Sequence, residues 1–305
     1  MTTPLPQFDY SPTRELAKSQ YHNFNPAGAI QAGVITPDDK PLPITSSAEP
    51  DFSAEQIELF HAVLEHLNEK KVPYVVAGAT ALREHTGIAR NTKDLDVFLP
   101  AEDVGAALES LQEAGFETEV PDPVWLAKAH RGEYFVDLIT GMSNAAIFVD
   151  QSWIDRGIPC TLFGTQVKVL APEELIASKL FVTRRERFDG ADIAHVIFAT
   201  RARLDWDRVL HLCGEHWEML LWTLVLFHYV YPAHSQLVPR RVWDELLGRF
   251  QAQLDAPDAK ARFRGSLVDP PMFNIDIAEW GMPNILEEYR ARRLQAIEAA
   301  EEPAA

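Results

Sequence analysis

The sequence predicts an α/β domain followed by a helical one, on three observations. Between residues 51 and 203, short apolar runs typical of buried strands alternate with segments of helical composition. Beyond residue 204 strand signals fade, while large aromatic residues fall within helical patterns, namely Trp206, Trp217, Trp222, Phe227, Trp243 and Phe250. Residues 1–50 are rich in proline and contain few apolar runs. We therefore expect a Pro-rich arm over 1–50, an α/β domain over 51–203 and an all-helical domain over 204–305.

The α/β domain is predicted to open with a helix. Ser53 is followed three residues later by Gln56, which is a capping-box pattern for a helix N-terminus. The apolar stripe of this helix is expected to consist of Ile57, Phe60, Leu64 and Leu67.

A glycine turn joins the next strand to the next helix. Val72–Ala77 has the composition of a buried strand, and it breaks at Gly78 into a helical segment, Ala79–His85. The turn therefore lies at a helix N-terminus, where unpaired backbone N–H groups and the positive end of the helix dipole face outward. Because Gly78 has no side chain, a phosphate can approach the backbone closely. This pattern indicates one half of a nucleoside triphosphate site.

Two carboxylates follow on the next predicted strand. In Asp94–Leu99 successive side chains alternate between faces, so Asp94 and Asp96 project together. Asp137 lies in a later apolar stretch, where a carboxylate without a cation carries a desolvation cost. Carboxylates suit Mg²⁺ or Mn²⁺, and a second ion roughly 3.5 to 4 Å away can serve an attacking hydroxyl. We predict a metal site for one or two ions formed by Asp94, Asp96 and Asp137.

The remaining elements complete the alternation of helix and strand. A helix is expected around Val104 to Leu111, a strand near Phe116 and a further strand around Asp137. Residues 158–170 read as a hairpin that turns near Gly164 and Thr165, and Pro172 opens the following helix.

Four further polar residues are compatible with ordinary structural roles. Arg90 could hold a γ-phosphate bidentately, although an exposed loop arginine is often only solvated. Lys179 emerges beside the apolar seam of its helix, where a snorkelling surface lysine would also lie. Asp189 and Asp192 are interpreted as a helix cap and a first-turn acid, outside the catalytic core.

The segments Val76–Leu82 and Gly87–Val97 together resemble the signature of the DNA polymerase β-like nucleotidyltransferase superfamily. Its bacterial members include minimal nucleotidyltransferases and AbiEii-type toxins. The similarity continues through Val169–Leu180 and Arg184–Ile193, which resemble the helical Lys and Arg/Asp segments of those bacterial groups. It covers roughly residues 55 to 200.

The resemblance implies a mixed sheet flanked by helices and assigns roles to individual residues. Asp94 and Asp96 would hold metal, while Asp137 would complete the site and help to activate an attacking hydroxyl. The chain departs from the family at Ala79, where glycine or serine is usual; alanine offers no hydroxyl and admits positive φ poorly. The predicted nucleotide- or phosphate-binding residues are Gly78, Ala79, Thr80, Arg90, Thr92 and Lys179.

Composition narrows the class of partner. A formal net charge of -17 repels polyanions and argues against extensive nonspecific nucleic-acid binding, although it leaves room for a local basic groove. The sequence shows neither a signal peptide nor a continuous apolar span of about 18 residues, so we expect a cytoplasmic protein without a membrane segment. The acceptor stays open among a small molecule, a tRNA 3′ end and a protein side chain, and a toxin-like member would have an antitoxin partner.

The predicted function is metal-dependent transfer of a nucleoside monophosphate from a nucleoside triphosphate to a hydroxyl acceptor, with release of pyrophosphate. Two alternatives remain at this point. One is a non-catalytic nucleotide-binding or interaction module, which the alanine at position 79 would suit. The other is hydrolysis of the triphosphate at the same metals.

Overall fold

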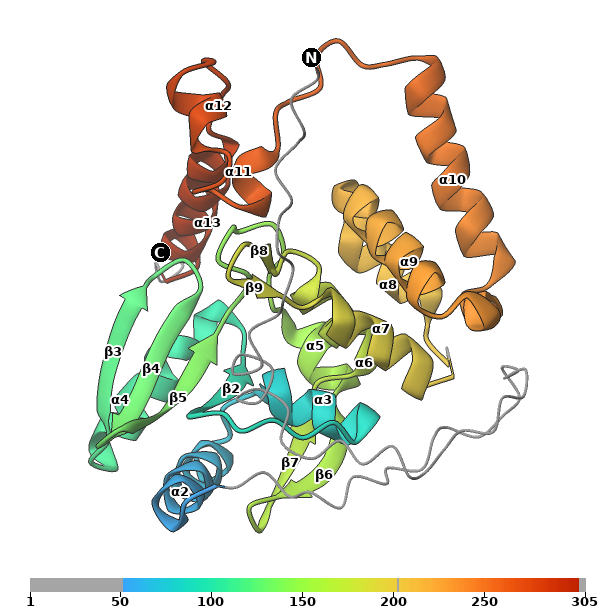
Figure 1. The fold of residues 1–305 in the computed structure, drawn as a ribbon. Helices are drawn as coiled ribbons and strands as arrows, with labels where there is room; N and C mark the ends of the chain where they lie inside the picture. The colour runs from blue at the N-terminus through green and yellow to red at the C-terminus, as the bar shows by residue number, and fades with distance from the viewer. Residues whose placement is uncertain (1–51, 202, 302–305) are drawn as a thin grey trace, which may run out of the picture.

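The computed structural model describes residues 52–201 and 203–301, so the predicted N-terminal arm lies outside the described residues. Its centre is a seven-stranded sheet in the order β3-β4-β5-β2-β1-β7-β6 (Figure 1). The strands are β1 Val75–Val76, β2 Asp94–Phe98, β3 Glu117–Asp122, β4 Leu126–Arg131, β5 Tyr134–Ile139, β6 Ile158–Leu162 and β7 Thr165–Val169. β2 pairs parallel with β5 and β1 parallel with β7, while the other pairs are antiparallel. The predicted mixed sheet is confirmed.

Helices flank this sheet. They are α2 Ala54–Glu69, α3 Gly78–Thr86, α4 Val104–Glu113, α5 Gln151–Arg156, α6 Pro172–Lys179 and α7 Gly190–Ala199. α2 packs on α4, β5 and β7, and α4 contacts β3 and β4. α3 lies against β2 and β7 and also packs on α6 and α7, which brings the α7 end of the domain next to the central strands.

α2 begins as predicted. Ser53 Oγ accepts a hydrogen bond from the Gln56 backbone at 3.1 Å, and the Gln56 side chain accepts one from the Ser53 backbone at 3.0 Å, which completes a capping box. The predicted stripe is wrong at Ile57, which is 42% exposed, whereas Val63 is fully buried. Ile57 lies at the edge of the buried face of α2, which consists of Gln56, Leu59, Phe60, Val63, Leu64 and Leu67.

The sequence pattern does not anticipate β4 or a small hairpin that precedes α7. β4 combines Lys128 and His130 with two alanines, which is a weak strand signal, and its pairing with β5 arises from the fold. The resemblance implies helix from residue 184, but β8 (Thr183–Arg184) and β9 (Arg187–Phe188) form a small hairpin there instead. The Asp189 N–H donates to the Val182 carbonyl at 2.8 Å and closes this hairpin, so helix α7 begins only at Gly190.

The predicted 158–170 hairpin is present as β6 and β7. Its turn consists of Phe163 and Gly164, one residue earlier than expected, and both have positive φ, +48° and +83°. A two-residue turn with positive φ at both positions matches the right-handed twist of the strands that it joins.

The C-terminal region is mostly helical. Its α-helices are α8 Trp206–Cys213, α9 Trp217–Val230, α10 Arg240–Asp255, α11 Gly265–Val268, α12 Asn274–Ala278 and α13 Ile285–Glu301. Figure 1 shows α8–α10 on one side of the molecule and α11–α13 on the other. Arg290 on α13 donates to both Asp122 oxygens at 2.9 Å, so this last helix docks on the end of β3. One continuous core runs from Leu59 to Ile285, and the domain boundary at residue 203 stays a prediction.

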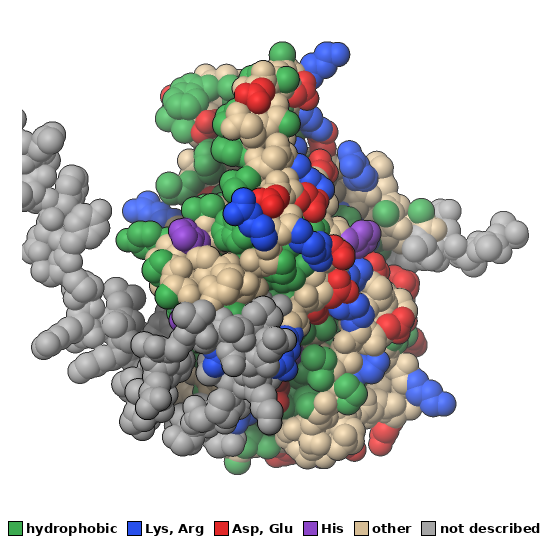
Figure 2. Space-filling view, turned by 90° about the vertical axis from the view of Figure 1, so that its right-hand side faces the viewer, with side chains coloured by type: hydrophobic (Ala, Val, Ile, Leu, Met, Phe, Trp, Pro, Cys, Tyr) green, Lys and Arg blue, Asp and Glu red, His purple; other side chains and the backbone are tan. Residues whose placement is uncertain are grey.

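Two surface features bear on possible partners. Within the described part of the chain, no helix is both long enough and apolar enough to span a bilayer. On the face drawn in Figure 2, Lys and Arg side chains are interspersed with Asp and Glu, so the charges of that face partly offset one another.

Candidate active site

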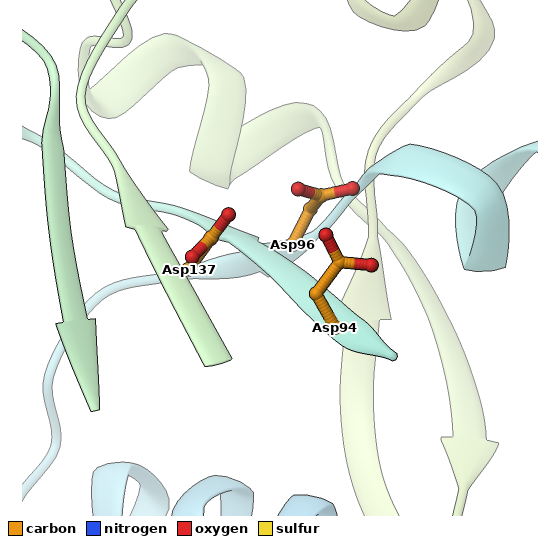
Figure 3. Close-up of side chains that lie close together, drawn as sticks. All are labelled: Asp94, Asp96 and Asp137. Carbon is orange, nitrogen blue, oxygen red and sulfur yellow. The ribbon is translucent and has the colours of Figure 1, made fainter. Parts of the chain in front are cut away.

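The predicted carboxylates come together on the two central parallel strands. β2 and β5 pair with Asp96 directly opposite Asp137, and Asp94 lies two residues before Asp96 on the same face. Figure 3 shows the three side chains projecting toward one another from these strands. One carboxylate oxygen from each residue lies within 4.8 Å of the others. Asp137 lies 41 positions after Asp96 in the sequence, and the register of β2 with β5 brings the two together. Strand pairing therefore completes a compact acidic cluster.

The N-terminus of α3 closes one side of this cluster. The Ala77 N–H donates to the Asp96 carbonyl at 2.8 Å, and Gly78 follows with φ +56°. A Cβ added at Gly78 would lie 1.7 Å from Asp96 Oδ2, so only glycine fits there. Ala79 is within α3 and does not have positive φ, so its departure from the family pattern costs a hydroxyl but no backbone strain.

Burial and like charge dominate the electrostatics of the cluster. Burial, together with the charges of Asp94 and Asp137, raises the pKa of Asp96 to about 7. The positive charges of Arg187 and Lys179 oppose this rise. Burial also raises the pKa of Asp137, and the hydrogen bond from Lys128 opposes this rise. Carboxylates held this way repel one another unless a cation or protons neutralise them.

The residues fit a divalent cation. Three converging carboxylates supply the hard oxygen ligands that Mg²⁺ and Mn²⁺ take. A bound ion would relieve the repulsion that raises the pKa of Asp96. Asp94, Asp96 and Asp137 are therefore the ligands that we assign to one or two such ions.

A pH-dependent response to metal follows from Asp96. Its folded-state pKa of about 7 lies above the ordinary 3.8, so its contribution to stability is complete below about pH 4 and is lost as the pH rises through about 7. Since metal binds the ionised form, we expect Mn²⁺ to raise the melting temperature more at about pH 8 than at about pH 5.5. Thermal melts in EDTA and in Mn²⁺ check this, with Asp96→Asn as control. Equal shifts at both pH values would contradict it.

Four predicted nucleotide-binding residues line one cavity. Its volume is about 360 Å³, and its walls include Ala79, Thr80, Arg90 and Thr92 together with Phe52 and Phe163. Thr92 Oγ1 also donates a short hydrogen bond to Asp94, so this residue links the cavity wall to the carboxylate cluster. Arg90 Nη1 donates to Asp192 at 2.9 Å, which directs its guanidinium toward α7. Gly78 lines the cluster instead of the cavity.

Lys179 lies in a buried ion network, and its side chain is only 6% exposed. Its Nζ is 2.7 Å from Asp189 and 2.8 Å from Asp192. Arg187 donates to Asp189 at 3.1 Å. Asp189 precedes α7 as expected but makes no cap hydrogen bond, because its carboxylate is taken by these two cations. The interpretation of Lys179 as a snorkelling surface lysine is therefore wrong, and its predicted phosphate contact remains a prediction.

Removing the Lys179 charge should destabilise the fold. Lys179→Met leaves Asp189 and Asp192 buried with less compensation, and breaking a buried ion pair on one side typically costs about 3–5 kcal/mol. Lys168→Met is the matched control, because it removes only one hydrogen bond, from Lys168 to the Ile154 carbonyl. Urea unfolding compares the two variants. A loss no larger than that of Lys168→Met would show that Arg90 and Arg187 suffice to hold the aspartates.

Lys128 is a residue of the site that sequence reasoning misses. It lies on β4 opposite Asp137, and its Nζ is 2.6 Å from Asp137 Oδ1. No local pattern distinguishes this lysine from any other. Only the alternation of β4, once its register with β5 is known, places Lys128 on the same face as the carboxylates.

The fold and the carboxylate cluster together define a nucleotidyltransferase-like protein. Residues 56–214, more than half of the chain, match the family described as "Nucleotidyl transferase of unknown function" (DUF2204). The chain therefore belongs to that family. The match leaves the AbiEii-type subgroup as a prediction, and no curated protein matches the chain.

Several solved structures are similar to this chain over most of their own length. The antibiotic-resistance factor ANT(2'')-Ia is 16% identical, with 61% of this chain and 97% of that chain covered and a TM-score of 0.37. The lincosamide adenylyltransferase LnuA is 17% identical, with 47% and 96% covered and a TM-score of 0.34. A putative nucleotidyltransferase from H. pylori is 14% identical, with 82% and 96% covered and a TM-score of 0.36. Likenesses this distant carry no argument about substrate.

Proposed function

We propose that this protein transfers a nucleoside monophosphate from a nucleoside triphosphate to an acceptor hydroxyl, with Mg²⁺ or Mn²⁺ at Asp94, Asp96 and Asp137. The observation that carries the proposal is the convergence of these carboxylates beside the Gly78 turn. Membership of a nucleotidyl transferase family supports it independently. Neither observation identifies the acceptor.

The chemistry assigns a task to each part of the site. The acceptor oxygen forms a bond to the α-phosphorus, the bond from that phosphorus to the bridging oxygen breaks, and pyrophosphate leaves. Asp137 takes the proton of the attacking hydroxyl, a role that its raised pKa suits. A bound divalent ion supplies charge neutralisation at the phosphate. The backbone N–H groups at the start of α3 stabilise the leaving phosphates, with Ala79 and Thr80 in the first turn.

The surrounding residues are proposed to hold the nucleotide. Arg90 and Thr92 share a cavity with the first turn of α3, and Thr92 also fixes Asp94. We assign this cavity to part of the bound triphosphate. Lys179 acts on the same site at longer range through its charge, which lowers the pKa of Asp96.

The acceptor is proposed to be a small molecule, a tRNA 3′ end or a protein side chain. A net charge of -17 favours an acceptor that is not a long polyanion. Of the structural neighbours, one is described with adenylyl-2"-tobramycin and one with lincomycin, and both descriptions concern those proteins. A toxin role with an antitoxin partner rests on the sequence resemblance alone.

The test is incubation of the purified protein with each α-labelled nucleoside triphosphate, Mn²⁺ or Mg²⁺, and separated cell fractions of RNA, protein and metabolites. Label that enters one fraction only with intact Asp96 supports transfer and identifies the acceptor class. Label recovered only as free nucleotide indicates hydrolysis. Binding of nucleotide without any product in any fraction would favour the non-catalytic module.

A further inference from the structure

Lys128 and Asp96 lie on opposite sides of Asp137. β4 pairs antiparallel with β5 so that Lys128 is opposite Asp137, and β2 pairs parallel with β5 so that Asp96 is opposite it on the other side. Lys128 Nζ is 2.6 Å from Asp137 Oδ1. Asp137 is therefore placed between a carboxylate that repels it and an ammonium group that attracts it.

The position of Lys128 is fixed by more than this ion pair. Its Nζ lies 3.9 Å from the centroid of the Phe135 ring, a cation–π contact within the same strand pair. Lys128 is 21% exposed and Asp137 is 13% exposed, so water screens their charge-assisted hydrogen bond only partly. A lysine held in this way must give up two interactions to leave Asp137.

The charges of the cluster favour one bound ion before substrate arrives. The three ionised carboxylates carry a formal charge of -3, and Lys128 offsets one of these negative charges. One divalent ion then brings the formal charge of the cluster to zero. Lys179 is left out of this sum, because its charge is paired with Asp189 and Asp192. A second divalent ion would leave an excess of two positive charges in a partly buried site, which a triphosphate would then neutralise.

We propose that Lys128 is a built-in counter-ion that competes with a divalent cation for Asp137. The inference rests on the proposed function and adds the number of ions to it. The substrate-free protein binds one ion tightly, at Asp94 and Asp96. A second ion, which needs Asp137, binds tightly only when a triphosphate has added negative charge to the site.

The test is titration of the substrate-free protein with Mn²⁺, in which the electron paramagnetic resonance signal of free Mn²⁺ reports how many ions bind and how tightly. Wild type should bind one ion tightly. Lys128→Met should bind a second ion with an affinity increased about tenfold or more, because it removes a positive charge 2.6 Å from Asp137 and about 1.4 kcal/mol corresponds to a tenfold change. Lys128→Arg should behave as wild type, and so should Lys168→Met on β7, which removes a lysine bonded to a backbone carbonyl. Lys128→Gln repeats the test if the methionine variant does not fold.

Two patterns of Mn²⁺ binding would overturn the inference, namely two tight ions in wild type or unchanged binding when Lys128 is replaced, and so would the absence of Mn²⁺ binding. Failure of the proposed function would look different. A wild-type protein that binds Mn²⁺ with the expected dependence on Lys128, yet labels no acceptor, would sustain the counter-ion role and count against transfer. A protein that binds no Mn²⁺ at millimolar concentration would overturn the counter-ion role directly.

Discussion

Asp96→Asn is expected to abolish nucleotidyl transfer, lowering kcat/KM at least a thousandfold, or about 4 kcal/mol of transition-state stabilisation. Asp96 lies between Asp94 on its own strand and Asp137 on the neighbouring one, so it is the central carboxylate of the cluster. An amide of the same shape cannot balance the charge of a divalent ion. The measurement is the initial rate of label transfer at saturating and at limiting triphosphate.

The same substitution should leave the fold intact. Burial and neighbouring charge raise the pKa of Asp96 to about 7, so an uncharged amide removes repulsion from the metal-free protein. Its melting temperature in EDTA near pH 8 should equal or exceed that of wild type. Glu117→Gln, an exposed carboxylate on β3 of the same sheet, is the control and should retain full activity. Transfer by Asp96→Asn at a tenth of the wild-type rate would contradict the assignment.

Gly78→Ala should have the second largest effect on transfer, because it introduces both a steric clash and backbone strain. Its Cβ would lie 1.7 Å from Asp96 Oδ2, and alanine would have to adopt φ +56°. Positive φ costs a residue with a Cβ about 1–2 kcal/mol, and with the clash added we expect a total loss of roughly 3 kcal/mol of unfolding free energy. Displacement of Asp96 should lower transfer about a hundredfold or more.

Substitutions at two other glycines separate the steric clash from the backbone strain in Gly78→Ala. Gly115 has φ +82° with no atom within 4 Å of an added Cβ, so Gly115→Ala carries the backbone strain without the clash. Gly105 lies within α4 with open space around it, and Gly105→Ala should slightly stabilise the protein. Both should retain transfer. If Gly78→Ala lost no more activity than Gly115→Ala, the close approach of the α3 turn to Asp96 would not matter for catalysis.

The parts of the site that could be predicted are those that depend on periodicity along one strand or helix. Alternation along one strand places Asp94 and Asp96 on one face, and a glycine between strand and helix marks a helix N-terminus, so both features can be read from neighbouring residues. Asp137 could be proposed because a carboxylate in an apolar strand needs a partner. Its position opposite Asp96, however, depends on the pairing of β2 with β5.

The features that escaped prediction depend on contacts between distant segments. Lys128 faces Asp137 through the β4–β5 register, and a shift of one residue would turn it to the other side of the sheet. Lys179 has the helical spacing of a surface residue, yet α7 covers it with Asp192. Ile57 fits the apolar spacing of α2, but it lies at the edge of the buried face of that helix and stays 42% exposed. Burial of this kind is decided by packing, which periodicity along one element does not contain.

The most direct test of the central claim compares the same triphosphate labelled at the α- or at the γ-phosphate, incubated with the protein, Mn²⁺ and the acceptor fraction. If the carboxylate cluster catalyses nucleotidyl transfer, the acceptor gains the α-label and none of the γ-label, pyrophosphate appears in equal amount, and Asp96→Asn gives neither product. An acceptor that gains the γ-label, or that gains the α-label equally with Asp96→Asn, would contradict the account.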